Sequence, residues 1–212
     1  MNEILPAIIA KDINELKDRL SQVEGLVSFV HLDIMDGVFV PPETWQKVSE
    51  LKDLSTDLNM EAHLMVADVE DKIDQWLDSK ISRIVLHFES LDKMRVHYIL
   101  DKIRSSGKEV GFSLKMETDI SEIEDFIDFI DVVQLMSIDK IGYYGESFDA
   151  RVISKIEFLH QKYPNVKISV DGGVNYESAK ILLKNNVDRL VVGSAIFKSE
   201  NIKNSIKTFQ NL

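Results

Sequence analysis

Residues 30–37 read VHLDIMDG, an apolar run typical of a β-strand that ends in polar residues and then in a glycine. Two other segments have the same form, AHLMV at 62–66 and SVDGGV at 169–174. Each segment joins a strand-like stretch to side chains that can take part in chemistry. Because side chains two positions apart on a strand point to the same face, we expect His31 and Asp33 to lie side by side.

Four residues of these segments form a candidate metal site: His31, Asp33, His63 and Asp171. Two imidazoles and two carboxylates from separate strand ends are suitable ligands for a divalent metal such as zinc. Carboxylates beside a bound cation can also move protons on a substrate that the cation polarises. The chain contains no cysteine, which excludes both a thiolate metal site and a disulfide framework. The sequence therefore predicts a metal with only N and O ligands.

The composition is that of an ordinary soluble protein, with 44% hydrophobic and 29% charged residues. The net charge of −11 argues against nucleic acid or an anionic membrane as a partner, because both bind positively charged surfaces. The start, MNEILPAIIAKDI, lacks the features of a signal peptide, and no apolar run reaches membrane-spanning length. We therefore expect a cytoplasmic protein. A small anionic substrate is still compatible, because backbone amides can hold a phosphate without lysine.

Strand-like runs alternate with amphipathic helix-like stretches along the whole chain. Several runs, such as IVLHF at 84–88 and VVQLM at 132–136, are apolar on both faces, as in buried parallel strands. The expected strands are 3–9, 28–34, 59–65, 82–88, 109–115, 131–137, 166–171 and 189–193, and the expected helices are 12–24, 43–54, 68–79, 92–106, 119–129, 149–162, 175–185 and 200–210. This alternation predicts one (β/α)8 barrel domain over residues 1–212. A doubly wound open sheet is the structural alternative.

The polar residues at strand ends favour the barrel over the open sheet. In a barrel, the C-terminal ends of all strands surround one mouth, where active sites lie. His31, Asp33, His63 and Asp171 all fall at such ends, so strands distant in the sequence can converge on one point. The segment HFE at 87–89 also ends a strand, and its His and Glu either orient a metal ligand or make only a structural hydrogen bond.

The ordered motifs LPAIIA, HLDIMDGVFVP, HLMV, LHFES, QLMS, VDGGV and VGSAIF resemble those of the ribulose-phosphate 3-epimerase family. The match runs from Leu5 to Phe197, and HLDIMDGVFVP and VDGG together are highly specific. The resemblance implies a metal-dependent isomerase of carbohydrate metabolism, in the pentose phosphate pathway, which converts D-ribulose 5-phosphate to D-xylulose 5-phosphate. It also implies a sugar phosphate as the small-molecule partner and the capacity to form homo-oligomers.

The resemblance assigns roles to the four candidate ligands. The residues that match His31, Asp33, His63 and Asp171 bind the metal, and those that match Asp33 and Asp171 also form an acid/base pair on opposite faces of the sugar carbon. One base cannot easily reach both faces, so epimerisation through an enediolate needs two carboxylates. Zinc is the first expectation for the metal, with iron, manganese and cobalt as alternatives, because affinity order and availability decide among them.

The resemblance places methionines around the reacting centre and glycine-rich loops around the phosphate. SVDGGVNYESAK runs from a strand through two glycines into a helix, and GSAIF ends the last strand. Glycines let the backbone approach an anion and direct N–H groups at it. The expected substrate-binding residues are Met35, Met65, Met136, Gly142, Gly145, Gly172, Gly173, Gly193 and Ser194.

Three positions depart from the family pattern. Ala7 stands where the family usually has a serine that contacts substrate, and Pro42 stands where an asparagine commonly follows FVP. The loop after the sixth strand usually reads M-x-V-x-P-G-F-G-G-Q, whereas this chain reads MSIDKIGYYGES at 136–147. Lys140 or Tyr144 could replace the amide contacts that the altered loop loses. The departures leave two alternatives open, a ketohexose substrate such as allulose 6-phosphate and a diverged barrel that binds a phosphosugar without catalysis.

Overall fold

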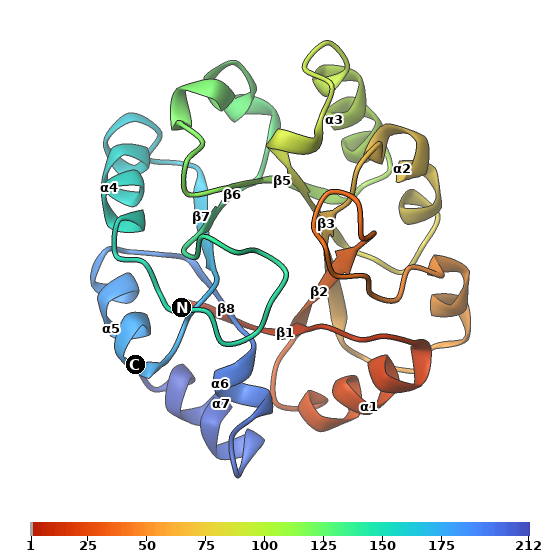
Figure 1. Cartoon of the computed structure of the whole chain (residues 1–212), viewed down its shortest axis with the longest axis vertical. Helices are drawn as coiled ribbons and strands as arrows, with labels where there is room; N and C mark the ends of the chain where they lie inside the picture. The colour runs from red at the N-terminus through yellow and green to blue at the C-terminus, as the bar shows by residue number, and fades with distance from the viewer. Residues whose placement is uncertain (1) are drawn as a thin grey trace.

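The computed structural model describes residues 2–212, which form a closed barrel of eight parallel strands with the connecting segments outside it (Figure 1). Each strand pairs with the next one in sequence order, and β8 pairs with β1 to close the barrel. The predicted (β/α)8 barrel is therefore confirmed. The strands are β1 (Glu3–Ile8), β2 (Phe29–Met35), β3 (Asn59–Met65), β4 (Arg83–His87), β5 (Glu109–Leu114), β6 (Val132–Met136), β7 (Lys167–Asp171) and β8 (Arg189–Val192).

The helices that cover the barrel begin at the caps that the sequence indicates. Asp12 accepts hydrogen bonds from the N–H groups of Asn14 and Glu15, and Asn175 forms a capping box with Ser178. Within residues 2–212, no helix has the length and apolar character needed to cross a bilayer. The α-helices are α1 (Ile13–Val23), α2 (Val69–Leu77), α3 (Val96–Ser105), α4 (Val152–Lys162), α5 (Tyr176–Lys184), α6 (Ser194–Phe197) and α7 (Ile202–Gln210), and the 3₁₀ helices are η1 (Val48–Asp53), η2 (Phe88–Ser90) and η3 (Ile120–Phe129).

The helix expected at 43–54 is shorter than predicted and is 3₁₀ in form, as η1. The start of this segment is held by the barrel instead. The N–H of Thr44 bonds to the carbonyl of Met35, and the N–H of Trp45 bonds to the carbonyl of Ala10. These backbone groups are therefore not available for a helical turn.

The helix expected at 119–129 is also 3₁₀ and not α-helical. Its apolar residues Ile120, Ile123, Phe126 and Phe129 recur every three positions. Because a 3₁₀ helix has three residues per turn, this spacing aligns them in one stripe. Ile120 and Ile123 are buried, which explains why the segment keeps the tighter winding against the barrel.

The register of β2 and β3 arranges the barrel interior in layers. Three successive interior pairs lie opposite each other, namely His31 with Glu61, Asp33 with His63, and Met35 with Met65. The alternate residues, such as Val30 and Leu32, point outward and pack in the large apolar core beneath the helices. A slip of one residue would exchange the two faces, so the apolar core fixes the position of the polar interior.

Candidate metal centre and active site

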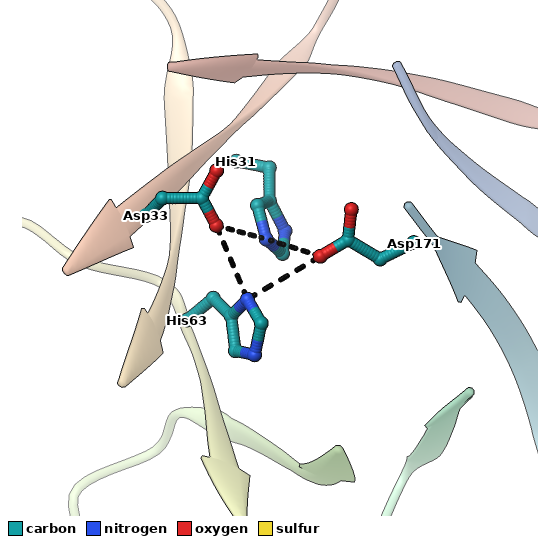
Figure 2. Close-up of side chains that lie close together, drawn as sticks. All are labelled: His31, Asp33, His63 and Asp171. Atoms are coloured by element: carbon teal, nitrogen blue, oxygen red, sulfur yellow. Dashed lines mark hydrogen bonds and ion pairs between the residues drawn. The ribbon is translucent and has the colours of Figure 1, made fainter. Parts of the chain in front are cut away.

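The structure brings together the four predicted ligands in the barrel interior (Figure 2). His31 and Asp33 project from β2, His63 projects from β3, and Asp171 is the last residue of β7. One nitrogen or oxygen atom from each side chain lies within 4.8 Å of the others. Strand ends that are distant in the sequence therefore form one buried cluster that could hold a metal ion.

Each carboxylate of the cluster faces both histidines. Asp33 Oδ1 lies 3.2 Å from His63 Nδ1 and 3.4 Å from His31 Nε2. Asp171 Oδ2 lies 3.4 Å from His63 Nδ1 and 3.7 Å from His31 Nε2. The histidine side chains are fully buried, and those of Asp33 and Asp171 are only 10% and 12% exposed. Because bulk water does not reach these charges, protons or a bound cation must compensate them.

The tautomer of His31 suits a metal ligand. Its Nδ1 lies 2.7 Å from Oε1 of Glu61, and an ionised carboxylate only accepts, so Nδ1 is the donor. The opposite atom, Nε2, is directed at the cluster and has no hydrogen-bond partner among residues 2–212. A lone pair that faces two carboxylates is repelled unless a cation lies between them. This unpaired atom and the set of two nitrogens and two oxygens fit a divalent metal such as zinc.

Protons compete with a metal for this cluster. Burial lowers the pKa of His31, but hydrogen bonds with Asp33 and Glu61 outweigh burial and hold that pKa well above 6.5. Burial likewise lowers the pKa of His63, and hydrogen bonds with Asp171 and Asp33 reverse the effect and raise it. Burial raises the pKa of Asp33, whereas its histidine partners bring the pKa below the usual range. Metal binding must therefore release protons.

The three predicted methionines lie together above the cluster. Met35, Met65 and Met136 belong to one buried apolar group. Met65 and Met136 line a small cavity beside the two aspartates. Met35 packs beneath Gly142, where an added Cβ would lie 2.8 Å from its sulfur, and so supports the loop above the cavity.

The predicted glycine loops form the other end of this cavity. Its volume is about 50 Å³, and its lining includes Gly142, Gly145, Gly172, Gly173, Gly193 and Ser194. The first four of these glycines have φ between +63° and +105°, a region that favours glycine. Gly173 also has no space for a side chain, because a Cβ would lie 2.6 Å from Cα of Phe148. The expected phosphate-binding residues and the aspartates therefore share one cavity.

Tyr144 closes the cavity toward β1. Its hydroxyl donates to the carbonyl of Ala7 at 2.8 Å and accepts from the N–H of Ile9 at 3.0 Å. The small side chain of Ala7 leaves room for the ring, which lies so close to Gly193 that a Cβ there would be 2.5 Å from Cε1 of Tyr144. Burial raises the pKa of Tyr144, so the phenol stays protonated. In this arrangement the hydroxyl proton bonds to the main chain and not to a substrate.

His87 and Glu89 support the cluster from β4 and η2. The His87 ring stacks on the His63 ring, with centroids 4.9 Å apart and planes at 28°. His87 Nδ1 lies 3.0 Å from Oε2 of Glu89, whose Oε1 accepts from the N–H of Lys115 and the hydroxyl of Thr118. Burial lowers the pKa of His87 to about 4, so its imidazole is neutral at neutral pH. The pair thus packs against one face of a candidate ligand.

Two polar residues beside the cluster, Glu61 and Gln134, were not among the predicted site residues. Glu61 stands two positions before His63 and shares its strand face, so E-x-H on β3 mirrors H-x-D on β2. Gln134 interrupts the apolar run VVQLM. Its fully buried amide nitrogen lies 3.4 Å from both ring nitrogens of His63 and from Oδ2 of Asp171. A charged or amide side chain on the interior face of a strand was the signal for both.

Comparisons with known proteins agree with this geometry. A family model described as the ribulose-phosphate 3 epimerase family matches residues 3–197. A ribulose-phosphate 3-epimerase of Chlamydia muridarum is 34% identical over 207 residues, which cover 94% of this chain and 90% of that protein. One of Schizosaccharomyces pombe is 29% identical over 214 residues, with 99% and 92% covered. Among solved structures, KGPDC from Streptococcus mutans has a TM-score of 0.77 at 14% identity, covers 99% and 96% of the two chains, and shows the same fold.

Proposed function

Because this chain belongs to the ribulose-phosphate 3-epimerase family and is thus an isomerase, we propose that it interconverts D-ribulose 5-phosphate and D-xylulose 5-phosphate. The observation that carries the proposal is the convergence of two histidines and two aspartates from three strands on one buried point. That point lies beside a cavity with an apolar methionine lining at one end and glycine loops at the other. This order of groups suits a sugar with a reacting ketose end and a phosphate.

We assign the acid/base roles to Asp33 and Asp171. Their carboxylates reach the cluster from opposite sides of the histidine pair, from β2 and β7 (Figure 2). One carboxylate takes the proton from C3, which leaves an enediolate, and the other, in its acid form, returns a proton to the opposite face. Positioned acid/base catalysis of this kind contributes on the order of 10²–10⁴-fold. Which aspartate starts depends on the epimer that is bound.

We infer that His31, Asp33, His63 and Asp171 hold one divalent metal ion, zinc first and iron, manganese or cobalt as alternatives. When bound, the ion would polarise the C2 carbonyl and so make the C3 proton more acidic. In this proposal the histidines act only as ligands, whereas the aspartates are ligands and proton carriers.

We assign substrate binding to the methionines and the loop residues of the cavity. The buried methionines lower the local dielectric, which strengthens the electrostatic stabilisation of a developing enediolate. The glycines leave the backbone accessible to the phosphate oxygens. The residues assigned in this way are Met35, Met65, Met136, Gly142, Gly145, Gly172, Gly173, Gly193 and Ser194.

The test is turnover of D-ribulose 5-phosphate by the purified protein, loaded in turn with zinc, iron, manganese and cobalt. We expect formation of D-xylulose 5-phosphate, and loss of turnover by about 10²-fold or more in Asp33→Asn and in Asp171→Asn. Asp139→Asn is the matched control, because Asp139 is an exposed aspartate outside the cluster. Absence of turnover with every metal would overturn the function, and near-normal activity in either cluster variant would overturn the two-aspartate mechanism.

A further inference from the structure

Glu61 connects the His31 side chain to a second polar system below the cluster. Its side chain is only 1% exposed. Oε1 accepts from Nδ1 of His31 at 2.7 Å, and Oε2 lies 3.4 Å from Nη1 of Arg189. Since a carboxylate has two oxygens, it can serve the histidine and the guanidinium at the same time.

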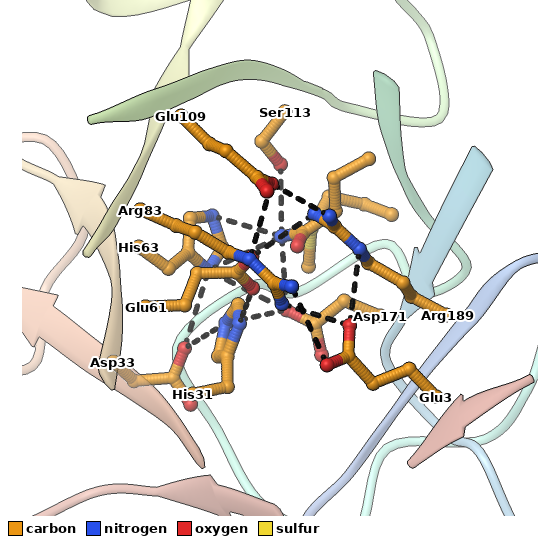
Figure 3. Close-up of polar contacts among 12 residues, drawn as sticks. Glu3, His31, Asp33, Glu61, His63, Arg83, Glu109, Ser113, Asp171 and Arg189 are labelled. Atoms are coloured by element: carbon orange, nitrogen blue, oxygen red, sulfur yellow. Dashed lines mark hydrogen bonds and ion pairs between the residues drawn. The ribbon is translucent and has the colours of Figure 1, made fainter. Parts of the chain in front are cut away.

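The second polar system consists of five charged side chains near the N-terminal ends of the strands, which we call the barrel floor (Figure 3). Its members are Glu3, Glu61, Arg83, Glu109 and Arg189. The Arg189 guanidinium faces all three carboxylates, at 3.3 Å from Glu3, 3.4 Å from Glu61 and 2.8 Å from Glu109. Arg83 pairs with Glu3 at 2.8 Å and with Glu109 at 3.1 Å.

The pairing within the barrel floor leaves the Glu61 charge to be shared with His31. Three carboxylates face two guanidiniums, so one negative charge is in excess. Glu3 and Glu109 each contact both arginines, whereas the floor contact of Glu61 is with Arg189 alone. The short contact of Glu61 with His31 is therefore its strongest, and it is directional.

This contact determines which histidine nitrogen faces the cluster. With Nδ1–H bound to Glu61, the ring cannot turn without leaving a buried carboxylate unpaired, which typically costs about 1–3 kcal/mol or more. Nε2 is then held toward Asp33 and Asp171, at 3.4 Å and 3.7 Å. Metal-binding histidines commonly donate their other N–H to a carboxylate in this way.

We propose that Glu61, held in place by Arg189, is a positioning residue that fixes the tautomer and ring orientation of His31 for metal binding. The inference rests on the metal centre of the proposed function. It adds a residue that does not contact the metal or the substrate. It also assigns a role to a buried charge that the acid/base chemistry does not use.

Glu61→Gln tests this role, because the amide has nearly the same shape but only one oxygen acceptor. It can satisfy His31 or Arg189 and not both. We expect the Kd of zinc, measured by competition with a chromophoric chelator, to rise by about 10- to 100-fold. In the cobalt-loaded protein we expect altered visible absorption bands, which report the geometry around the ion.

Glu109→Gln is the matched control. Glu109 belongs to the same barrel floor and contacts the same Arg189, but its ion pairs are with the arginines and not with His31. We expect this variant to lose thermal stability while it keeps the wild-type zinc affinity. Equal weakening in both variants, or no weakening in Glu61→Gln, would overturn the proposal.

A measurement on the wild type guards against a Glu61→Gln protein that fails to fold. ¹⁵N chemical shifts of the zinc-loaded, histidine-labelled protein should show Nδ1 of His31 protonated and Nε2 bound to the metal. Coordination through Nδ1 would overturn the proposal. Turnover measured on the same preparation separates the two hypotheses, since the metal results stand or fall without a substrate and a failed epimerase assay leaves them unchanged.

Discussion

Tyr144→Phe should tighten the binding of substrate, because the wild-type hydroxyl holds the cavity closed. The closed cavity has a volume of about 50 Å³. That space holds only about three or four water molecules, which is too small for a pentose phosphate. The segment that carries Tyr144 must therefore move before the substrate enters, and the movement breaks the bonds to Ala7 and Ile9.

The size of the effect follows from those two hydrogen bonds. At about 0.5–1.5 kcal/mol each, they stabilise the closed arrangement by roughly 1–3 kcal/mol relative to an open one in which water replaces them. Phenylalanine keeps the ring against Gly193 and removes only the bonds. If the open form is scarce in the wild type, the fraction that can bind increases and the KM for D-ribulose 5-phosphate falls by roughly 5- to 150-fold.

Two assays check this reasoning, steady-state kinetics and limited trypsin cleavage after the exposed Lys140. We expect Tyr144→Phe to lower KM and to speed cleavage. Tyr143→Phe is the control, because Tyr143 also lines the cavity but is 47% exposed. A higher KM in Tyr144→Phe would refute the reasoning and would mean that the hydroxyl contacts the substrate. Unchanged cleavage would mean that the two bonds do not hold the loop.

Three further predictions concern stability and metal content. Gly173→Ala should destabilise the protein by about 1–3 kcal/mol more than Gly145→Ala in urea unfolding, since both have positive φ but only Gly173 meets the Phe148 backbone; equal costs would contradict the packing. The folded-state pKa of His87, about 4, lies below the unfolded value of 6.5, so unfolding free energy should decline as pH falls from 6.5 to 4, by up to about 1.4 kcal/mol per pH unit, and His87→Asn should remove that slope; a slope that persists in the variant would assign it to other groups. Chelation should abolish turnover, and zinc at about 100 times its Kd should stabilise the folded protein by about 2.7 kcal/mol; an unchanged Tm would argue against the metal centre.

The sequence was sufficient for the barrel and for the convergence of the four ligands, and the reason is periodicity. The run at 84–88 is apolar on both faces, which only a covered parallel strand requires. His31 and Asp33 share a face because side chains alternate along a strand. The segment 43–54 could not be predicted in the same way, because Thr44 and Trp45 bond to distant parts of the barrel, and no local pattern records that.

Glu61 and Tyr144 show a second limit of the sequence. The position of Glu61 on the interior face was predictable from its spacing to His63, but its pairing with His31 depends on the register between β2 and β3. Tyr144 read as the loss of a phosphate-binding glycine, whereas the structure gives its hydroxyl two partners on β1. Both contacts join residues far apart in the chain, which single-sequence patterns do not encode.

The barrel floor has a consequence for how the chain folds. Its charges come from β1, β3, β4, β5 and β8, so ion pairing is complete only when the last strand closes against the first. A fragment that ended after β4 would hold Glu3, Glu61 and Arg83 without Arg189, and it would have to bury an uncompensated negative charge. Half-barrel intermediates are therefore disfavoured, and we expect the chain to unfold in one cooperative transition.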